Sequence, residues 1–421
     1  MIALQKLEGP YGIPVYYQRM PEVVRSVSMA WVIFAGAADD ASVGAPGLYH
    51  WFEHVPFRGT KKYPGGYQDI KGRFTRYGGA INAWTSLHAT KYHAHVPVKV
   101  WPEALSVITD LFAQPLLTEE GINAEREIIR QEIQGKRAAS GKRVSYELPH
   151  LLWPGHPFGH HTLGSEESLD SMKPSILREA HQANYDRSRA AFVFVGNVTL
   201  EEVLEELHSL KDILPSHGLL ERRAPEYYGS LPKWKGGDVT TVETEFTSSI
   251  IMMLFPLPEH EDRKFIYLRW GTLESLFDYG GLSSPLYRIL REERKLVYAT
   301  SAISNYCPGG GFIGFVAEAK KEKIDPIAEA FKDLLEDSTV RSVERLKEIQ
   351  EGVVSGMDMK PVSSMEIRDT MIGRLINAGT LVNDDEYQED LLSTRTDDME
   401  TMLEVLRPKN AHTLIFKGMG T

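Results

Sequence analysis

The chain has 421 residues, 42% of them hydrophobic and 25% charged, and this length favours two or more domains over one. Its 47 basic and 58 acidic residues give a formal charge of −11 without a long basic run, so neither nucleic acid nor a membrane is an expected partner. No basic segment with an apolar core follows Met1, which predicts a cytoplasmic protein with no secretory signal and no membrane-spanning segment.

The first half of the chain alternates between short strands and longer helices. Residue periodicity predicts, in chain order, strands over 13–18, 26–36, 80–85, 91–96 and 190–195, and helices over 101–112 and 118–134. The two runs at 80–85 and 91–96 are expected to be antiparallel neighbours. Thr118, followed by two glutamates, is a suitable start for the second helix.

The second half repeats this order after a segment that predicts a linker. Residues 219–237 are rich in Arg, Pro, Tyr, Gly and Lys and have no period. Beyond them come a strand over 248–255, a helix over 262–277, a strand pair over 296–305 and 311–317, and a closing strand over 413–416. We therefore predict an α/β (α+β) fold of two duplicated sandwich domains, 1–218 and 238–421, each a mainly antiparallel sheet packed with helices.

The chemistry is concentrated in the segment that begins at Pro46, where His50-Trp-Phe-Glu53-His54 forms an H-x-x-E-H run. With Cys307 as the only cysteine, any metal must use histidine and carboxylate ligands. On a helix the two histidines lie about 40° apart around the axis, so both can reach one ion. Glu53 lies on the adjoining flank, where a general base can contact a metal-bound water. The alternative is a chance match with both histidines solvated.

A third ligand is predicted at Glu132, on the helix over 118–134. Glu125 precedes it by seven residues, so the two carboxylates lie nearly above one another after two helical turns. Glu132 can then bind the ion while Glu125 braces a histidine or the ion from behind. The alternative is an exposed, charged helix. Together with the two histidines, Glu132 completes a two-His, one-Glu zinc site that leaves a fourth position for water.

These motifs resemble the inverzincin peptidases, the zinc peptidase family that includes pitrilysin, insulysin and the mitochondrial processing peptidase. The resemblance spans nearly the whole chain and extends to four further runs, Phe57-Arg-Gly-Thr-Lys-Lys, residues 78–85, His156-Pro-Phe-Gly and Leu163-Gly164. It implies one zinc ion per chain. It also implies that the Asn82-Ala83 backbone pairs with an extended substrate beside the zinc, which recognises peptide main chain with little regard for side chains.

In the second half the resemblance extends to Arg291 and Tyr298, seven residues apart, which it implies engage the substrate carbonyl. Purely structural roles are the alternative for both. One departure from the family is Pro56, which disfavours a helical Val55, so the motif helix is expected to end early or to kink.

The sequence thus predicts a zinc-dependent metalloendopeptidase that hydrolyses unfolded peptides or processing segments, with water activated by zinc and Glu53. The alternative is a non-catalytic peptide-binding or assembly subunit of a paired complex. A homodimer, or a heterodimer with a related subunit, is the expected assembly. His93 and His95 share one strand face but lack a nearby third ligand, so a surface or packing role is predicted for them.

Overall fold

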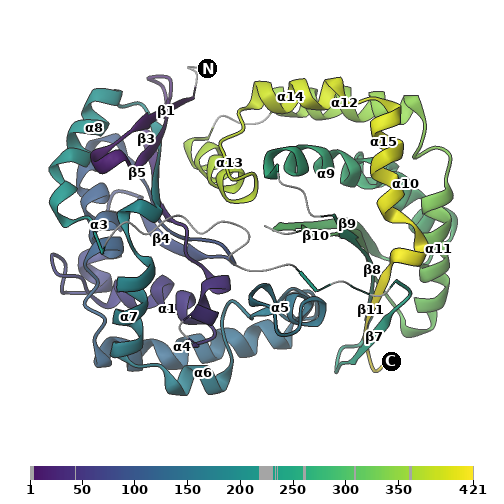
Figure 1. Cartoon of the computed structure of the whole chain (residues 1–421), viewed down its shortest axis with the longest axis horizontal. Helices are drawn as coiled ribbons and strands as arrows, with labels where there is room; N and C mark the ends of the chain where they lie inside the picture. The colour runs from purple at the N-terminus through teal and green to yellow at the C-terminus, as the bar shows by residue number, and fades with distance from the viewer. Residues whose placement is uncertain are drawn as a thin grey trace. The chain divides into compact units, whose positions relative to one another are not determined.

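The computed structural model describes residues 4–42, 44–217, 231–232, 234, 236–258, 262–307, 310–359 and 363–420 (Figure 1). Contacts divide the chain into two compact units, Met1–Tyr228 with Val362–Ile376, and Gly229–Pro361 with Asn377–Thr421. Most of the predicted linker, residues 219–230 together with 233 and 235, lies outside the described residues. The domain boundaries therefore stay a prediction.

The first unit is built on a six-stranded sheet of order β1-β2-β6-β3-β5-β4 (Figure 1). Its strands are β1 (Gln5–Glu8), β2 (Pro14–Arg19), β3 (Ser26–Ile33), β4 (Ala80–Thr85), β5 (Thr90–Pro97) and β6 (Ala190–Gly196). Neighbours are antiparallel except β2 with β6. The central strands β3 and β6 are almost fully buried because both faces of the sheet are covered there, whereas the edge strand β4 alternates between exposed and buried residues. The strands predicted in this half are confirmed, with shifted ends.

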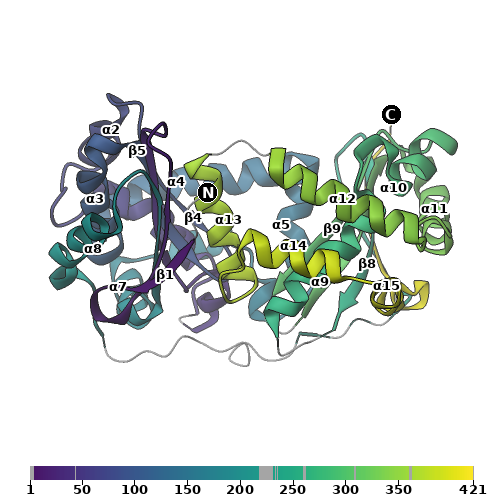
Figure 2. The same ribbon diagram turned by 90° about the horizontal axis from the view of Figure 1, so that it is seen from above.

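Helices cover both faces of this sheet. The helices of this unit are α1 (Leu48–His54), α2 (Arg73–Thr75), α3 (Trp101–Ala113), α4 (Glu119–Ala138), α5 (Ser140–Leu152), α6 (Glu166–Ser171), α7 (Pro174–Asn184), α8 (Leu200–Ser209) and α13 (Ser364–Asn377), of which α5 and α6 pack on α4. Figure 2 shows α3 and α8 on one face of the sheet and α13 on the other. As predicted, Thr118 caps α4, where its side chain accepts a hydrogen bond from the Gly121 amide.

Helix α13 meets the sheet through polar side chains. Its Arg368 is only 1% exposed and donates to the carbonyl of Ala94 on β5 at 3.2 Å. The Ser28 hydroxyl lies 3.0 Å from the Ser364 hydroxyl and 2.7 Å from Nδ1 of His95. Of the surface or packing role predicted for His95, the structure therefore shows packing, since this imidazole is bonded within the layer between β5 and α13.

The second unit repeats the topology of the first. Its five-stranded sheet has the order β7-β11-β8-β10-β9, with β7 and β11 parallel and the other neighbours antiparallel. The strands are β7 (Val239–Glu243), β8 (Ser249–Leu257), β9 (Ala299–Cys307), β10 (Gly310–Ala319) and β11 (His412–Lys417). The helices are α9 (Arg263–Asp278), α10 (Pro285–Tyr287), α11 (Ile324–Glu336), α12 (Val343–Met359), α14 (Asp384–Ser393) and α15 (Thr396–Leu403).

The two sheets correspond strand by strand once β1 is set aside. In this correspondence β3 matches β8, β5 matches β10 and the edge strand β4 matches β9. Helix α1 packs on β4 and β5, and α9 packs on β9 and β10, so the two helices occupy equivalent places. The predicted duplicated α/β fold is confirmed. None of the described helices is both long and apolar enough to cross a membrane, and the cytoplasmic location stays a prediction.

Candidate metal centre

Helix α1 starts at a buried carboxylate. Asp40 accepts hydrogen bonds from the amides of Gly47 at 2.6 Å and Tyr49 at 3.3 Å, which occupies donors that the first turn of a helix leaves unpaired. Burial raises the pKa of Asp40 well above its usual range, and these backbone donors oppose the rise. The α-helix ends at His54, as expected, but Val55 keeps helical angles (φ −61°, ψ −37°) and residues Val55–Arg58 continue as a 3₁₀ turn, so the predicted non-helical Val55 is wrong.

The two motif histidines face one carboxylate from α4. Their rings are 4.7 Å apart, and their side chains are 3% and 16% exposed for His50 and His54. Oε2 of Glu132 lies 3.5 Å from Nε2 of His50 and 3.7 Å from Nε2 of His54. Three nitrogen and oxygen atoms from two helices therefore converge on one point.

Glu53 lies beside this point on α1. Its Oε2 is 3.9 Å from Nε2 of His50, and its ligand atom lies within 4.8 Å of those of both histidines. Burial raises the pKa of Glu53 to about 7, although the charge of His54 and hydrogen bonds from Thr85 oppose the rise. Without a metal this carboxyl is therefore partly protonated near neutral pH, and a bound cation would lower its pKa.

Glu125 holds His54 through the ring nitrogen that does not face Glu132. Its side chain is fully buried and accepts hydrogen bonds from Nδ1 of His54 at 2.9 Å, from Nε of Arg58, and from the hydroxyl of Tyr67 at 3.2 Å. Burial alone would raise the pKa of Glu125, but the bonds to His54 and Arg58 outweigh burial and hold it below the usual value. This arrangement fixes which nitrogen of His54 faces Glu132.

The charge distribution suits a cation. Burial lowers the pKa of His50 to about 4, which keeps this imidazole neutral as a metal ligand must be. Burial also acts to lower the pKa of His54, yet Glu125 and Glu132 outweigh burial and raise it to about 9. Without a metal, His54 is thus protonated among the surrounding carboxylates, and metal binding would release this proton.

The donor spacing also fits a metal ion. Donor atoms about 2.1 Å from one tetrahedral zinc ion lie about 3.4 Å from each other. The separations of 3.5 Å and 3.7 Å between Glu132 and the two histidines are close to that value. The residues that the sequence predicted therefore fit zinc in both chemistry and spacing.

Sequence reasoning missed three polar residues that support this centre. Arg58 and Tyr67 bond to Glu125, and Lys71 donates to Oδ1 of Asn82 at 3.0 Å. Arg58 lies four residues after His54 within a run already matched to the family, so its position was a usable signal. We find no comparable signal for Tyr67 or Lys71.

The predicted substrate strand, β4, is the edge of the first sheet. Asn82 is exposed, whereas the side chain of Ala83 is 3% exposed and points into the core. At the end of β4, the Thr85 hydroxyl donates to the carbonyl of Tyr49 at 3.2 Å, which ties the strand to α1. Strand β4, whose outer side pairs with no other described strand, therefore packs against the helix that carries the motif.

Arg291 and Tyr298 both belong to the second unit, where they contact each other. Arg291 lies on a π-helical turn over Arg288–Glu293 and donates to the carbonyl of Tyr298 at 3.3 Å. Its guanidinium is 5.5 Å from the centre of the Tyr298 ring, and the tyrosine is 84% exposed. A tyrosine so exposed does not serve core packing, but its action on a substrate stays a prediction.

The fold and the side-chain cluster together define a class of duplicated α/β proteins in which one half carries a histidine–glutamate cluster that could hold a metal ion. Two family models match the sequence in succession, Insulinase (Peptidase family M16) over residues 18–166 and Peptidase M16 inactive domain over residues 171–352. The chain belongs to peptidase family M16, the insulinase family, which confirms the resemblance seen in the sequence. The description of the second model agrees with the absence of an H-x-x-E-H run after residue 171.

Individual relatives are distant in sequence. An uncharacterized zinc protease of Streptomyces coelicolor is 25% identical over 336 residues, which cover 78% of this chain and 70% of that protein. A probable mitochondrial-processing peptidase subunit beta of Schizosaccharomyces pombe is 27% identical over 194 residues, which cover 46% of this chain and 42% of that protein. The crystal structure of a protease from Helicobacter pylori matches over 99% of both chains with a TM-score of 0.85 at 17% identity, a similarity of fold alone.

Proposed function

We propose that this chain is a zinc metalloendopeptidase that hydrolyses unfolded peptides or processing segments, with one zinc ion held by His50, His54 and Glu132. The observation that carries the proposal is the single Glu132 oxygen within 3.7 Å of Nε2 of both motif histidines. A non-catalytic peptide-binding or assembly subunit would be favoured by an incomplete metal site. Every donor that the site requires is present among the described residues, which favours the enzyme.

The chemistry is divided between the metal and the side chains around it. When bound, zinc supplies a Lewis acid that lowers the pKa of water and polarises a carbonyl. Glu53 accepts the proton of the attacking water on its carboxylate and returns it to the departing amine. Glu125 accepts a hydrogen bond from Nδ1 of His54, so Nε2 is the nitrogen that would bind the metal once it has released its own proton.

The substrate is proposed to add as a strand to the free edge of β4. Main-chain hydrogen bonds to Asn82 and Ala83 would give affinity without strict side-chain selection. The proposal is supported by the edge position of β4 and by the bond from Thr85 to Tyr49, which holds its end against α1. Tyr298 is proposed to donate to the oxyanion and Arg291 to hold the tyrosine in place, a proposal that rests on their mutual contacts and the family resemblance.

The assembly is proposed to be a homodimer or a heterodimer with a related subunit. The Schizosaccharomyces pombe relative is itself named as a subunit, which supports a paired arrangement. Mass measurement in solution, on the chain alone and with co-purifying proteins, distinguishes the two forms.

Glu53→Gln tests the catalytic proposal, because the amide keeps the shape of the side chain but accepts no proton. We expect the variant to hold one zinc ion per chain, measured by metal analysis, and to leave a quenched peptide uncleaved. Glu132→Gln should instead lose zinc, since it weakens one of three protein ligands. Cleavage by Glu53→Gln would exclude Glu53 as the base, and full zinc occupancy in Glu132→Gln would exclude Glu132 as a ligand.

A further inference from the structure

Residues 163–172, here called the bracket, touch both helices that carry the proposed metal ligands. At its first end the bracket meets the start of α1. Gly47 and Gly164 both have positive φ, 80° and 77°, and a Cβ built on Gly47 would lie 2.6 Å from Cα of Gly164. A Cβ on Gly164 would lie 2.6 Å from the carbonyl oxygen of Pro46. The two backbones are therefore in direct contact, with no space for a side chain between them.

The bracket is held at this end by α5. The hydroxyl of Tyr146 donates to the carbonyl of Gly164 at 2.8 Å. Immediately afterwards, Ser165 and Ser168 form a reciprocal capping box that starts α6. The direction of α6 is thus fixed relative to the contact between Gly47 and Gly164.

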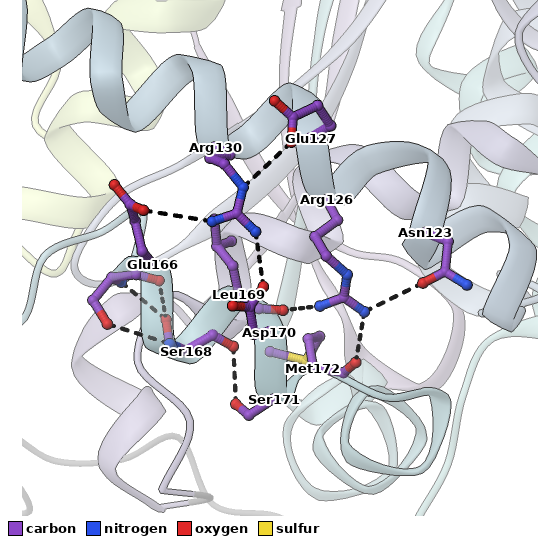
Figure 3. Close-up of polar contacts among 11 residues, drawn as sticks. Asn123, Arg126, Glu127, Arg130, Glu166, Ser168, Leu169, Asp170, Ser171 and Met172 are labelled. Atoms are coloured by element: carbon purple, nitrogen blue, oxygen red, sulfur yellow. Dashed lines mark hydrogen bonds and ion pairs between the residues drawn. The ribbon is translucent and has the colours of Figure 1, made fainter.

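At the other end of the bracket, Arg126 of α4 forms hydrogen bonds to its backbone (Figure 3). The guanidinium donates to the carbonyl of Leu169 and, at 3.2 Å, to the carbonyl of Met172, which terminate α6. The Leu169 carbonyl also accepts from the Met172 amide at 3.3 Å, and the carbonyl end of a helix favours a cation. The same guanidinium lies 5.7 Å from the ring of Trp51 on α1. Arg126 therefore contacts the bracket and the motif helix at once.

Arg130, one turn later on α4, makes a different kind of contact. Figure 3 shows its guanidinium among three carboxylates, Asp170 at 2.7 Å, Glu127 at 3.3 Å and Glu166 at 3.6 Å. The side chains of these acids are 66%, 66% and 44% exposed. Exposed ion pairs contribute little to stability because water competes for both partners. The attachment of the bracket to α4 therefore depends mainly on the hydrogen bonds of Arg126.

We propose that Arg126 is a positioning residue for the metal centre, which rests on the zinc site proposed above. Through the bracket it fixes the separation between α1, which carries the two histidines, and α4, which carries Glu132. A zinc site tolerates errors of only about 0.2 Å in its metal–ligand distances. Among the described residues, the hydrogen bonds of Arg126 go to Leu169, Met172 and Asn123 and to neither the metal ligands nor the substrate strand, so its removal changes the spacing of the donors without changing their chemistry.

The test compares Arg126→Met with Arg345→Met. Methionine keeps an unbranched stem beside Trp51 but removes the hydrogen-bond donors. Arg345 of α12 is the matched control, because it caps the C-terminus of α9 in the second unit with bonds to the carbonyls of Leu276, Ser275 and Tyr279 at 3.0, 3.1 and 2.7 Å. Three quantities are measured on the full chain: the zinc Kd by chelator competition, the visible spectrum of the cobalt(II)-loaded protein, and the Tm of the metal-free protein.

We expect Arg126→Met to weaken zinc binding about 10-fold, the lower end for groups that orient ligands indirectly, and to shift the cobalt bands. Arg345→Met should lower the Tm while the zinc Kd and the cobalt spectrum stay native. Arg130→Met should stay within about twofold of the native zinc Kd because its partners are exposed. If Arg126→Met does not fold, Arg126→Lys replaces it, with a smaller shift in the same direction.

A native zinc Kd and cobalt spectrum in the folded Arg126 variant would overturn the positioning role and leave the proposed zinc site intact. An equal change in Arg345→Met would also overturn it, since it would show that general destabilisation weakens the site. Failure of the native chain to bind zinc is a separate result, which would overturn the proposed function and this inference with it.

Discussion

Replacing Glu125 with glutamine tests the support of the metal centre most directly. The carboxylate is fully buried and accepts from three donors, on His54, Arg58 and Tyr67. A glutamine has nearly the same shape but only one acceptor oxygen, so at least one of these donors loses its partner. Outer partners of metal-binding histidines are worth about 10- to 100-fold in metal affinity. Zinc binding by Glu125→Gln should therefore weaken by about 1.4 to 2.8 kcal/mol.

The assay is chelator competition for zinc, with Glu127→Gln as the control. Glu127 lies on the same helix, but its side chain is 66% exposed and bonds only to Arg130 among the described partners. The control should bind zinc as the native chain does. Native zinc affinity in Glu125→Gln would refute the reasoning, because it would mean that the bond at 2.9 Å to His54 does not hold that imidazole in place.

Three further predictions concern Asn82 on β4, Tyr298, and His93 in the layer between β5 and α13. Asn82→Ala keeps the main-chain groups but removes the side chain that accepts from Lys71, and it should lower kcat/KM for a quenched peptide about 2- to 10-fold, the value of one hydrogen bond, with zinc content unchanged; equal kinetics would exclude a role for the Asn82 side chain at the substrate strand. Tyr298→Phe should lower turnover about 100- to 1000-fold without unfolding, and near-native turnover would exclude an oxyanion role. Burial lowers the pKa of His93, the charges of Arg368 and Lys91 act in the same direction, and together they bring this pKa to about 3. The unfolded chain, in which this histidine has its ordinary pKa, therefore binds more protons than the native chain between about pH 6.5 and 3. The Tm of the metal-free protein should therefore fall as the pH drops through this range, and His93→Asn should flatten the fall; parallel curves would contradict the assignment.

Most of the metal centre could be predicted because its signals are local. The four-residue spacing of His50 and His54 places both on one face of a helix. The seven-residue spacing of Glu125 and Glu132 places both carboxylates on one face of a second helix. Pro56 lies in the 3₁₀ turn that follows the first helix, where its missing amide donor is tolerated, so it indicates roughly where the α-helix ends. Such signals need no knowledge of how distant segments meet.

The rest depends on distant contacts. Tyr67 reaches Glu125 across 58 positions and only because of the path taken by the turns after α1. Helix α13 follows α12 in sequence, yet its Arg368 bonds to Ala94 in the first unit, 274 positions away. A charged residue in a helix usually indicates a solvated face. Nothing in the order of residues indicates that this one is buried.

The duplication predicts what happens when the metal is removed. Helix α9 occupies the place of α1 in the second unit and contains no histidine, so this topology forms without metal ligands. In the first unit, Leu48, Trp51 and Phe52 of α1 are fully buried, and each such side chain contributes about 1.5 to 3 kcal/mol. Zinc at 1,000 times its Kd adds only about 4 kcal/mol.

Chelation should therefore leave the far-ultraviolet circular dichroism unchanged and lower the Tm by about 10 °C, a shift that added zinc reverses. His50→Ala is the control, because its Tm should already be near the metal-free value and should not respond to the chelator. Loss of the helical signal on chelation would mean that α1 folds around its metal, as zinc fingers do, and that the buried side chains of α1 do not hold it in place.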